Sequence, residues 1–383
     1  MKKYDFIIVG AGFFGATCAR LLTDKGYNCL ILERNSYVGG LCADQESNGI
    51  NVTLYGPHVL YTDDDNVWEF ITRFGKINNY LHNEVMVKND MLFRIPLDMI
   101  TINQLFKKTT SQSAYTQILN EIKNYNINNV ENLEDICITK FGTTIYGFLL
   151  KNFYEKKFGR KCSEMAINMP FMIPLSMKHE AKYYDTKYQG YPVLGYTKLI
   201  ENIIGDDIDI MLNYDFIKNI DKFIKTESII LYTGALDELC RYSFGMLPWQ
   251  SAKFTQTNES IRGNYIYGCS VLNVEDPKQE LLRITEHKWF TPERINNPLY
   301  NKSNIVTYEY AKKWEPGDPT LYALIDSDSS ELVKKYMDFV NEHYPNILLC
   351  GKNGSFDNFT ICESISGAMA LCSSIKNKQS EKQ

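Results

Sequence analysis

The chain has 383 residues, a formal net charge of −5 and a hydrophobic fraction of 44%. This length predicts two or three domains of roughly 100–200 residues each, with ample material for a core. The negative charge argues against a nucleic-acid-binding protein, because phosphate contacts need clustered Lys and Arg. No apolar run reaches the roughly 18 residues of a membrane span, so we expect neither nucleic acid nor a membrane as a partner.

The cysteines and histidines predict a reducing compartment and no metal site. The ten cysteines are scattered without a CxxC pair, which is typical of reduced, mostly buried thiols in a cytoplasmic protein. The five histidines are too widely separated for metal-ligand spacing. The apolar run after the two N-terminal lysines is short and leads into a glycine turn, which indicates a strand and not a signal peptide.

The N-terminal segment predicts a βαβ unit. The apolar run "YDFIIV" is followed by "GAGFFG", by the helical stretch "ATCARLLTDKG" and by a second apolar run, "NCLILE". Strand, tight turn, helix and strand follow one another here in the order that such a unit needs.

Helices and strands then alternate in blocks. From roughly 100 to 160, apolar residues recur at spacings of three and four and predict helices, and 196–204 predicts another helix. Between about 250 and 325, runs such as "LLRITEHKWF" are rich in β-branched and aromatic residues and predict antiparallel strands. The final "NILLCGKNG" and "ESISGAMALCSSI" predict a strand, a glycine loop and a helix.

A strand, a glycine turn and a helix therefore follow one another at both ends of the chain, an arrangement that resembles flavin proteins of the glutathione-reductase type. The predicted fold is α/β plus α+β, with a discontinuous FAD-binding Rossmann-type βαβ domain, a helical domain and an antiparallel β-sheet domain. The expected boundaries are 1–80 with 190–240 and 338–383 for the FAD-binding domain, 97–170 for the mainly helical substrate domain, and 81–96 with 171–189 and 241–337 for the sheet domain.

The glycine turn predicts a dinucleotide site. Gly10, Gly12 and Gly15 fit G-x-G-x-x-G, in which the glycines allow a sharp turn, close approach of a pyrophosphate and tight helix packing. Glu33 follows Gly15 by 18 residues and can accept hydrogen bonds from both ribose hydroxyls of an adenosine. It would repel a 2′-phosphate, although the neighbouring Arg34 could partly offset that repulsion.

A second glycine pair, Gly39 and Gly40 in "VGGLC", lies six residues beyond Glu33. This sequel is typical of FAD proteins and unlike most NAD dehydrogenases, so we expect FAD as the cofactor.

Over nearly its whole length the chain resembles the bacterial UDP-galactopyranose mutase family, as a divergent member. The matching stretches are "YDFIIVGAGFFGATCARLL", "LERNSYVGG", "YGPHVLYTDD", "YEKKFGRKCSEM", "KYQGYPVLGYTKLIE", "IILYTGALDE", "SFGMLPWQSAKF" and "RITEHKWF". "YQGYPVLGYTKLIE" and "YTGALD" are specific to the family, whereas the bare glycine fingerprint is not.

The resemblance implies an isomerase that interconverts the pyranose and furanose forms of a nucleotide-activated sugar. N5 of reduced FAD attacks the anomeric carbon in this chemistry, and NADH or NADPH is the expected external reductant. Relatives are usually homodimers in polysaccharide biosynthesis, so a cytoplasmic homodimer is expected.

The family clamps the diphosphate of its substrate with two arginines. One matches Arg283, which the resemblance makes catalytic and substrate-binding. The other position holds Met172. Another cation, such as Lys178 or Lys182, would therefore have to contact the diphosphate in place of the arginine, or the phosphate would be bound differently.

Further substrate positions also depart from the family. The Tyr and Trp of its motif "YTEKQWG" align with Phe153 and Phe158, for which core packing is the alternative interpretation. Tyr183 falls on a family tyrosine. The C-terminal Arg, Tyr and Asp of the family align with Lys352, Asn358 and Thr360. The resemblance assigns Phe153, Phe158, Met172, Tyr183, Arg283, Tyr322 and Asn358 to the substrate, and Leu41, Gly234, Gly351, Lys352, Thr360 and Ile361 to the cofactor.

The stretch "YGPHVLYT" matches the family's "YGAHIFHT", a loop beneath the flavin ring. His58 matches the first family histidine and is expected beside the flavin as a polar wall that tunes it, which gives it both catalytic and cofactor-binding roles. Tyr61 replaces the second histidine, and Pro57 stiffens the backbone before His58.

The departures gather at the substrate and spare the FAD motifs, so we expect a sugar other than plain UDP-galactose. A flavin-dependent redox or elimination enzyme on a nucleotide sugar is one alternative, and a non-catalytic flavin-binding protein is another.

Overall fold

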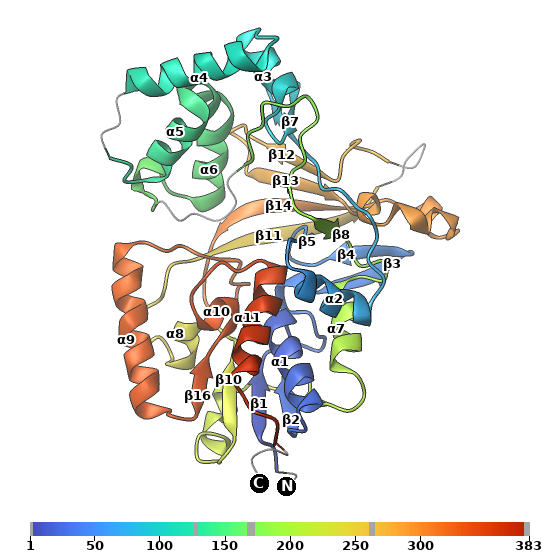
Figure 1. Cartoon of the computed structure of the whole chain (residues 1–383), viewed down its shortest axis with the longest axis vertical. Coiled ribbons are helices and arrows are strands. Elements are labelled where there is room, and N and C mark those ends of the chain that lie inside the picture. Colours follow the sequence, from blue (N-terminus) through green and yellow to red (C-terminus); the bar gives the residue numbers. More distant parts are fainter. Residues whose placement is uncertain (1–2, 126–128, 167–172, 260–264, 379–383) are drawn as a thin grey trace.

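The computed structural model describes residues 3–125, 129–166, 173–259 and 265–378. Figure 1 shows a parallel sheet flanked by helices at the bottom, a larger sheet across the middle and a helical block at the top. Both termini lie at the bottom, beside the parallel sheet. The predicted fold class is confirmed.

The parallel sheet is assembled from both ends and the middle of the chain. Its strand order is β16-β10-β1-β2-β9, and every neighbouring pair runs parallel. The strands are β1 (Phe6–Val9), β2 (Cys29–Leu32), β9 (Asp209–Met211), β10 (Ile229–Tyr232) and β16 (Ile347–Leu349). This is the discontinuous Rossmann-type arrangement that the sequence predicts.

Helices cover both faces of this sheet, and the side chains of β1 alternate between the two cores. Phe6 and Ile8 join the core under the first helices, whereas Ile7 and Val9 join the core on the opposite face. The first face carries α1 (Phe13–Asp24), α2 (Asp65–Phe74), α7 (Tyr196–Ile204) and α11 (Ile361–Ser373), and the second carries α8 (Leu236–Leu239) and α9 (Ser327–His343). Helix α9 packs on the parallel sheet, although the expected boundary assigns 327–337 to the sheet domain.

The larger sheet has seven strands in the order β15-β11-β14-β13-β12-β6-β7. It is antiparallel as predicted, except that β6 pairs with β12 in parallel. The strands are β6 (Glu84–Lys88), β7 (Met91–Ile95), β11 (Trp249–Asn258), β12 (Val271–Val274), β13 (Leu281–Glu286), β14 (Ile305–Lys313) and β15 (Tyr322–Ala323). The register places Arg283 between Asn273 and Glu309 on neighbouring strands.

The helical block contains α3 (Met99–Phe106), α4 (Ser111–Tyr125), α5 (Leu133–Ile145) and α6 (Lys151–Phe158), with a π-helical turn at Tyr146–Leu150 before α6. Two small antiparallel sheets pair β3 (Asp44–Ser47) with β4 (Ile50–Thr53) and β5 (Leu60–Thr62) with β8 (Tyr188–Gly190). A short α10 (Gly351–Gly354) follows β16.

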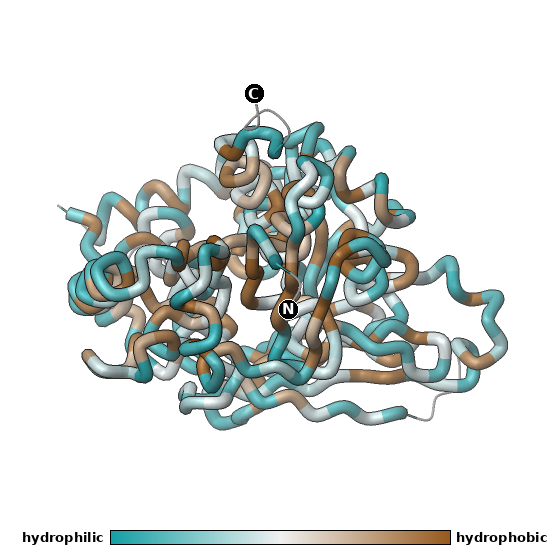
Figure 2. Tube along the Cα trace, turned by 90° about the horizontal axis from the view of Figure 1, so that it is seen from below, coloured by the Kyte–Doolittle hydropathy of each residue, from teal (hydrophilic) through white to brown (hydrophobic). Residues whose placement is uncertain are grey.

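In Figure 2 many of the hydrophobic segments lie toward the centre of the molecule. All ten cysteines are free thiols, and all except Cys42 are buried. None of the described helices combines the length and the apolarity that crossing a membrane requires.

Candidate functional site

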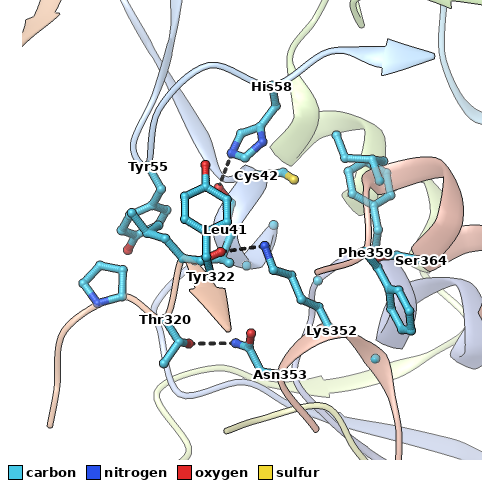
Figure 3. Close-up of a pocket in the computed structure, with 18 of the residues that line it drawn as sticks. Leu41, Cys42, Tyr55, His58, Thr320, Tyr322, Lys352, Asn353, Phe359 and Ser364 are labelled. Atoms are coloured by element: carbon cyan, nitrogen blue, oxygen red, sulfur yellow. Dashed lines mark hydrogen bonds between the residues drawn. The ribbon is translucent and has the colours of Figure 1, made fainter. Parts of the chain in front are cut away.

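A cavity of about 430 Å³ lies between the parallel sheet and the seven-stranded sheet. One end is formed by the glycine turn after β1 and by the ends of β2 and β10. The other end is formed by side chains of β6, α6, β13, β14 and β15. Figure 3 shows part of this lining, including Leu41, His58, Tyr322 and Lys352. We call the two parts the cofactor end and the substrate end.

The cofactor end is a concave surface made of backbone, at which several glycines leave no room for a side chain. A Cβ at Gly15 would lie 2.1 Å from the Gly10 carbonyl oxygen, and Gly10 itself has φ +105°. A Cβ at Gly40 would lie 3.2 Å from the Cα of Gly12, so the two backbone segments pack closely together. Gly12 is the N-cap of α1 without a side-chain cap, so the first N–H groups of the helix remain available to an anion.

Glu33 stands where β2 ends and is only 4% exposed. Its Oε2 accepts from the backbone N–H of Ala11 at 2.8 Å, and its Oε1 accepts from the backbone N–H of Asn35 at 2.8 Å. A carboxylate offers about four acceptor positions, so Glu33 retains capacity for a ribose hydroxyl. Arg34 forms an ion pair with Glu238 at 3.0 Å, which competes with binding of a 2′-phosphate. The cradle and Glu33 fit the adenosine diphosphate part of FAD.

His58 forms a neutral wall between the two ends. Its Nε2–H donates to the carbonyl oxygen of Leu41 at 2.8 Å (Figure 3). Burial, with smaller contributions from the cations Lys352 and Arg283, lowers the pKa of His58 to about 4, against the raising effect of the Leu41 hydrogen bond. The imidazole is therefore uncharged at neutral pH, and its Nδ1 is an acceptor.

Arg283 on β13 is buried and paired with Glu309 on β14. Its Nε lies 3.2 Å from Glu309 Oε2, and its Nη2 lies 3.4 Å from Glu309 Oε1. Burial opposes the charge, yet Glu309 and Glu84 hold the pKa of Arg283 above its ordinary value. The guanidinium therefore stays charged, and much of its charge is balanced by Glu309.

The directions of a buried hydrogen-bond chain are determined by its last acceptor. The Ser270 hydroxyl donates to the Asn83 carbonyl at 2.8 Å, and the Tyr80 hydroxyl donates to Ser270 at 2.7 Å. The Tyr80 oxygen is left to accept from Nδ1 of His82 at 3.0 Å. The ring of His82 therefore carries a proton on Nδ1.

The other nitrogen of His82, Nε2, faces Glu84. It lies 3.0 Å from Glu84 Oε1, and Glu84 Oε2 accepts from the amide of Asn273 at 2.7 Å. Burial would raise the pKa of Glu84, but the His82 and Asn273 hydrogen bonds and the charges of His82 and Arg283 lower it to about 2. An ionised Glu84 only accepts, so Nε2 of His82 faces Glu84 as the hydrogen-bond donor of this buried pair.

Aromatic rings cover the remaining wall of the substrate end. Tyr61 stacks on Tyr184 with ring centroids 3.6 Å apart and an interplanar angle of 10°. The ring centroid of His82 lies 5.8 Å from that of Tyr184 and 4.7 Å from that of Tyr183. Burial raises the pKa of Tyr61 to about 12, so the ring is a neutral stacking surface.

Most residues predicted from the sequence line this one cavity. They are Gly10, Gly12, Gly15, Glu33, Arg34, Gly39, Gly40, Leu41, His58, Phe153, Tyr183, Gly234, Arg283, Tyr322, Gly351, Lys352, Thr360 and Ile361. Met172 lies outside the described residues.

Phe158 and Asn358 lie elsewhere. Phe158 is 3% exposed and packs in the core of the helical block, with its ring stacked on Tyr154. It follows Phe153 by five residues, so the two side chains point to different sides of α6. The Asn358 side chain exchanges hydrogen bonds of 3.0 and 2.8 Å with the backbone of Ala323, and thereby positions β15 instead of lining the cavity.

The cations that line the substrate end include one that sequence reasoning missed. Lys178 and Lys182 are exposed and do not line the cavity. Lys157 does, and it is 6% exposed. It follows Phe153 by four residues, so the helical period places both on one face, a signal that the sequence already contained. Sequence reasoning also missed the His82–Glu84 pair and Glu309.

Lys157 and Lys352 both lie close to the ring of Tyr322. Their Nζ atoms are 5.1 and 4.9 Å from the centroid of the Tyr322 ring. Lys352 also donates to the Leu321 carbonyl at 2.6 Å (Figure 3). Burial lowers the pKa of each lysine to about 8, and the charge of Arg283 contributes to the lowering at Lys157.

Known proteins resemble this chain along its whole length. The family profile described as UDP-galactopyranose mutase matches residues 148–357, and that of an NAD(P)-binding Rossmann-like domain matches 8–74. A probable UDP-galactopyranose mutase of Klebsiella pneumoniae is 28% identical over 386 residues, covering 99% of this chain and 97% of that protein. A dTDP-fucopyranose mutase of Escherichia coli is 27% identical over 356 residues, covering 91% and 92%.

A crystal structure of reduced UDP-galactopyranose mutase has a TM-score of 0.70 with this structure, at 13% identity over 96% of this chain and 95% of that one, and so shares the fold. The relatives matched over more than nine tenths of this chain are mutases, which makes the protein an isomerase of the intramolecular transferase type. The profile match spans more than half of the chain, and the chain therefore belongs to the UDP-galactopyranose mutase family.

Proposed function

We propose that the protein is a flavin-dependent mutase that interconverts the pyranose and furanose forms of a nucleotide-activated sugar. One observation carries the proposal. A single cavity joins a dinucleotide cradle to a substrate end that contains Arg283, the buried Lys157 and the half-buried Lys352. A diphosphate-linked sugar needs such a cluster of cations beside a bound cofactor.

The proposal assigns the cofactor end to FAD. Gly10 and Gly12 admit the pyrophosphate, and Gly15 lets α1 pack closely on β1. Glu33 accepts from the ribose, and the segment around Gly40 closes over the cofactor. Gly39, Leu41, Gly234, Gly351, Thr360 and Ile361 complete this end, with Arg34 beside Glu33. Bound FAD in its reduced form supplies a nucleophile for the anomeric carbon, and NADH or NADPH serves as the external reductant.

The side chains of the substrate end orient the sugar nucleotide and exclude water. Arg283 neutralises the charge that develops on the departing diphosphate, and Glu309 holds the guanidinium in place. Neutral His58 offers Nδ1 as an acceptor to the cofactor or the sugar. Phe153, Tyr183 and Tyr322 provide an apolar and aromatic wall, beside the Tyr61–Tyr184 stack.

The names of the relatives support a nucleoside-diphosphate sugar as substrate, because the Klebsiella pneumoniae protein is named for UDP-galactopyranose and the Escherichia coli protein for dTDP-fucopyranose. We further infer a cytoplasmic homodimer that acts in polysaccharide biosynthesis. Its FAD-binding domain would be formed by 1–80, 190–240 and 338–383 together with α9, whose residues Tyr336 and Val340 share a core with β1.

A product assay tests the function. The reduced holoenzyme is incubated with UDP-, dTDP- and GDP-sugars, and the products are separated and identified by NMR. We expect a furanose without net oxidation of the flavin. A keto or deoxy product would contradict the proposal and indicate redox or elimination chemistry. Absence of turnover, with no sugar-dependent change in the reduced-flavin spectrum, would indicate a non-catalytic flavoprotein.

A further inference from the structure

The substrate end must balance the two negative charges of a nucleotide-sugar diphosphate. Arg283 is a cation there, but its Nε already lies 3.2 Å from the buried carboxylate of Glu309, and the buried carboxylate of Glu84 lies 3.0 Å from His82. Neither pair leaves an uncompensated positive charge. The charge that a diphosphate requires must therefore come from other side chains of the same wall.

Lys157 has the position and the burial for this task. It lies near the C-terminal end of α6, on the face that Phe153 presents to the cavity. Its Nζ lies 5.1 Å from the Tyr322 ring centroid, and Lys352 approaches the same ring from its own element at 4.9 Å. The side chain is 6% exposed, so water screens its charge weakly.

Holding a lysine in this place costs the free protein stability. Lys157 is removed from water and is repelled by Arg283 and Lys352, while the attraction of Glu309 and Glu84 offsets only part of the cost. A methionine or leucine would fill the same volume without that cost. A bound dianion reverses the balance, because it lowers the repulsion among the three cations.

We propose that Lys157 binds the substrate diphosphate together with Arg283, and thereby supplies the second cation that position 172 lacks. The inference rests on the proposed function, since it assigns a residue of the same site. It replaces Lys178 and Lys182, which are exposed and lie outside the cavity, as the compensating cation. A lysine contacts phosphate as a point charge and not as a planar fork, so this clamp tolerates more than one diphosphate geometry.

Titration of the oxidised holoenzyme with UDP tests the assignment. Isothermal calorimetry at pH 7 compares wild type with Lys157→Met, Lys157→Gln and Lys157→Arg. We expect Lys157→Met and Lys157→Gln to weaken UDP binding about 30-fold or more, the loss typical of removing one partner of a buried charge pair. Lys157→Arg should stay within about tenfold of wild type, since it keeps the charge but changes its geometry.

Two controls distinguish loss of the Lys157 charge from a change in the shape of the cavity wall. Lys178→Met removes an exposed lysine that does not line the cavity, and it should leave the UDP affinity unchanged. Uridine carries no phosphate, so its affinity should be the same for wild type and Lys157→Met. A weaker uridine affinity of the variant would show that the cavity wall had been disturbed and would overturn the proposal.

Three further outcomes of these titrations would test the assignment of Lys157 and the proposed function. Equal UDP affinity of wild type and both neutral variants would refute the role of Lys157, even if the enzyme makes furanose. Loss of bound FAD in both neutral variants would assign Lys157 a structural role and refute it as well. If Lys157→Met loses UDP binding but wild type forms no furanose from any sugar, the proposed function fails while the diphosphate contact stands.

Discussion

The two ends of the cavity are built from different parts of the polypeptide. The cofactor end is made largely of backbone, with Gly10, Gly12 and Gly40 closing around the start of α1 and Glu33 as its main charged side chain. The substrate end is made of charged and aromatic side chains from β6, α6, β13, β14 and β15. A backbone cradle changes little when side chains are substituted, whereas the substrate end can be rebuilt by a few substitutions while the fold is retained.

The largest effect is expected at the cofactor end. Gly15→Val places a Cβ where only 2.1 Å separates it from the Gly10 carbonyl oxygen, and neither backbone can move without breaking the turn. We expect a protein without FAD, destabilised by about 3 kcal/mol or more. Flavin absorbance per mole of purified protein measures the loss.

Gly147→Ala is the matched control, because an added Cβ there meets nothing within 4 Å. It should retain FAD and stability close to those of wild type. Full FAD occupancy in Gly15→Val would show that the glycine turn is not the pyrophosphate cradle.

The next largest effect is expected at the substrate end, from Arg283→Ala. It removes the charge that stabilises the departing diphosphate and should lower kcat/KM by about a thousandfold. The flavin spectrum should persist, because Arg283 lies on β13 and the cradle is formed by other elements. Steady-state kinetics and flavin absorbance on the same preparation measure both.

The same substitution leaves Glu309 buried without its partner, at a cost of about 3–5 kcal/mol in stability. The double variant Arg283→Ala with Glu309→Ala should recover stability and not activity. If the double variant regains activity, Arg283 acts only by neutralising Glu309, and if the single variant loses FAD, the residue belongs to the cofactor end.

A smaller effect is expected from Lys157→Met, which should raise the stability of the protein, whereas Gly15→Val and Arg283→Ala should lower it. The pKa of Lys157 is about 8 in the folded protein, below its ordinary 10.5. The unfolded chain therefore binds more protons between those two values, and the stability of wild type rises with pH across that window. The groups that face Lys157 include Arg283, Glu309, Glu84, Lys352, Tyr322 and Phe158, and all of these are retained in the variant.

We expect Lys157→Met to be more stable than wild type by about 1–3 kcal/mol at pH 7, where the burial cost is complete. The difference should shrink as the pH approaches 10.5. Urea unfolding of both proteins at pH 7 and pH 10 measures it. A variant that is less stable at pH 7 would mean that Lys157 is held by compensating contacts and carries no burial cost.

The smallest effects are expected from substitutions of two phenylalanines on α6, one that lines the cavity and one that does not. Both phenylalanines belong to the core of the helical block, but only Phe153 also lines the cavity. Phe158→Leu should cost about 1–2 kcal/mol of stability and leave KM unchanged. Phe153→Leu should raise KM by about threefold to tenfold, because it removes contact area from the substrate wall. Reversed results would place the wall on the other side of α6.

The parts of the fold that could be predicted are those with local signals. The helix predicted at 196–204 begins and ends at Tyr196 and Ile204, because its apolar residues recur with a clear helical period after a glycine turn. Helix α9 was not predicted, since only Ser329, Tyr336 and Val340 along its 17 residues are buried and its apolar stripe is narrow. The parallel pairing of β6 with β12 was also missed, because it joins segments far apart in the chain.

The candidate site divides in the same way. Gly10, Gly12, Gly15 and Glu33 could be predicted because a turn and a strand end within one βαβ unit place them together. Phe158 and Asn358 were assigned by alignment, and the structure gives both of them packing or backbone contacts instead. Alignment assigns a position in the chain, but the direction of a side chain depends on its neighbours in space.

The sequence by itself determined the family, the discontinuous Rossmann-type fold and the cofactor end, because these depend on backbone conformation and on contacts within short segments. Only the tertiary structure decided which charges face the substrate. Arg283 meets Glu309 across neighbouring strands, and Asn273 reaches Glu84 across 189 residues of chain. Lys157 becomes a cavity cation because α6 docks with that face toward the site. Charge pairing acts over a few ångströms, and such distances are determined only when the chain has folded.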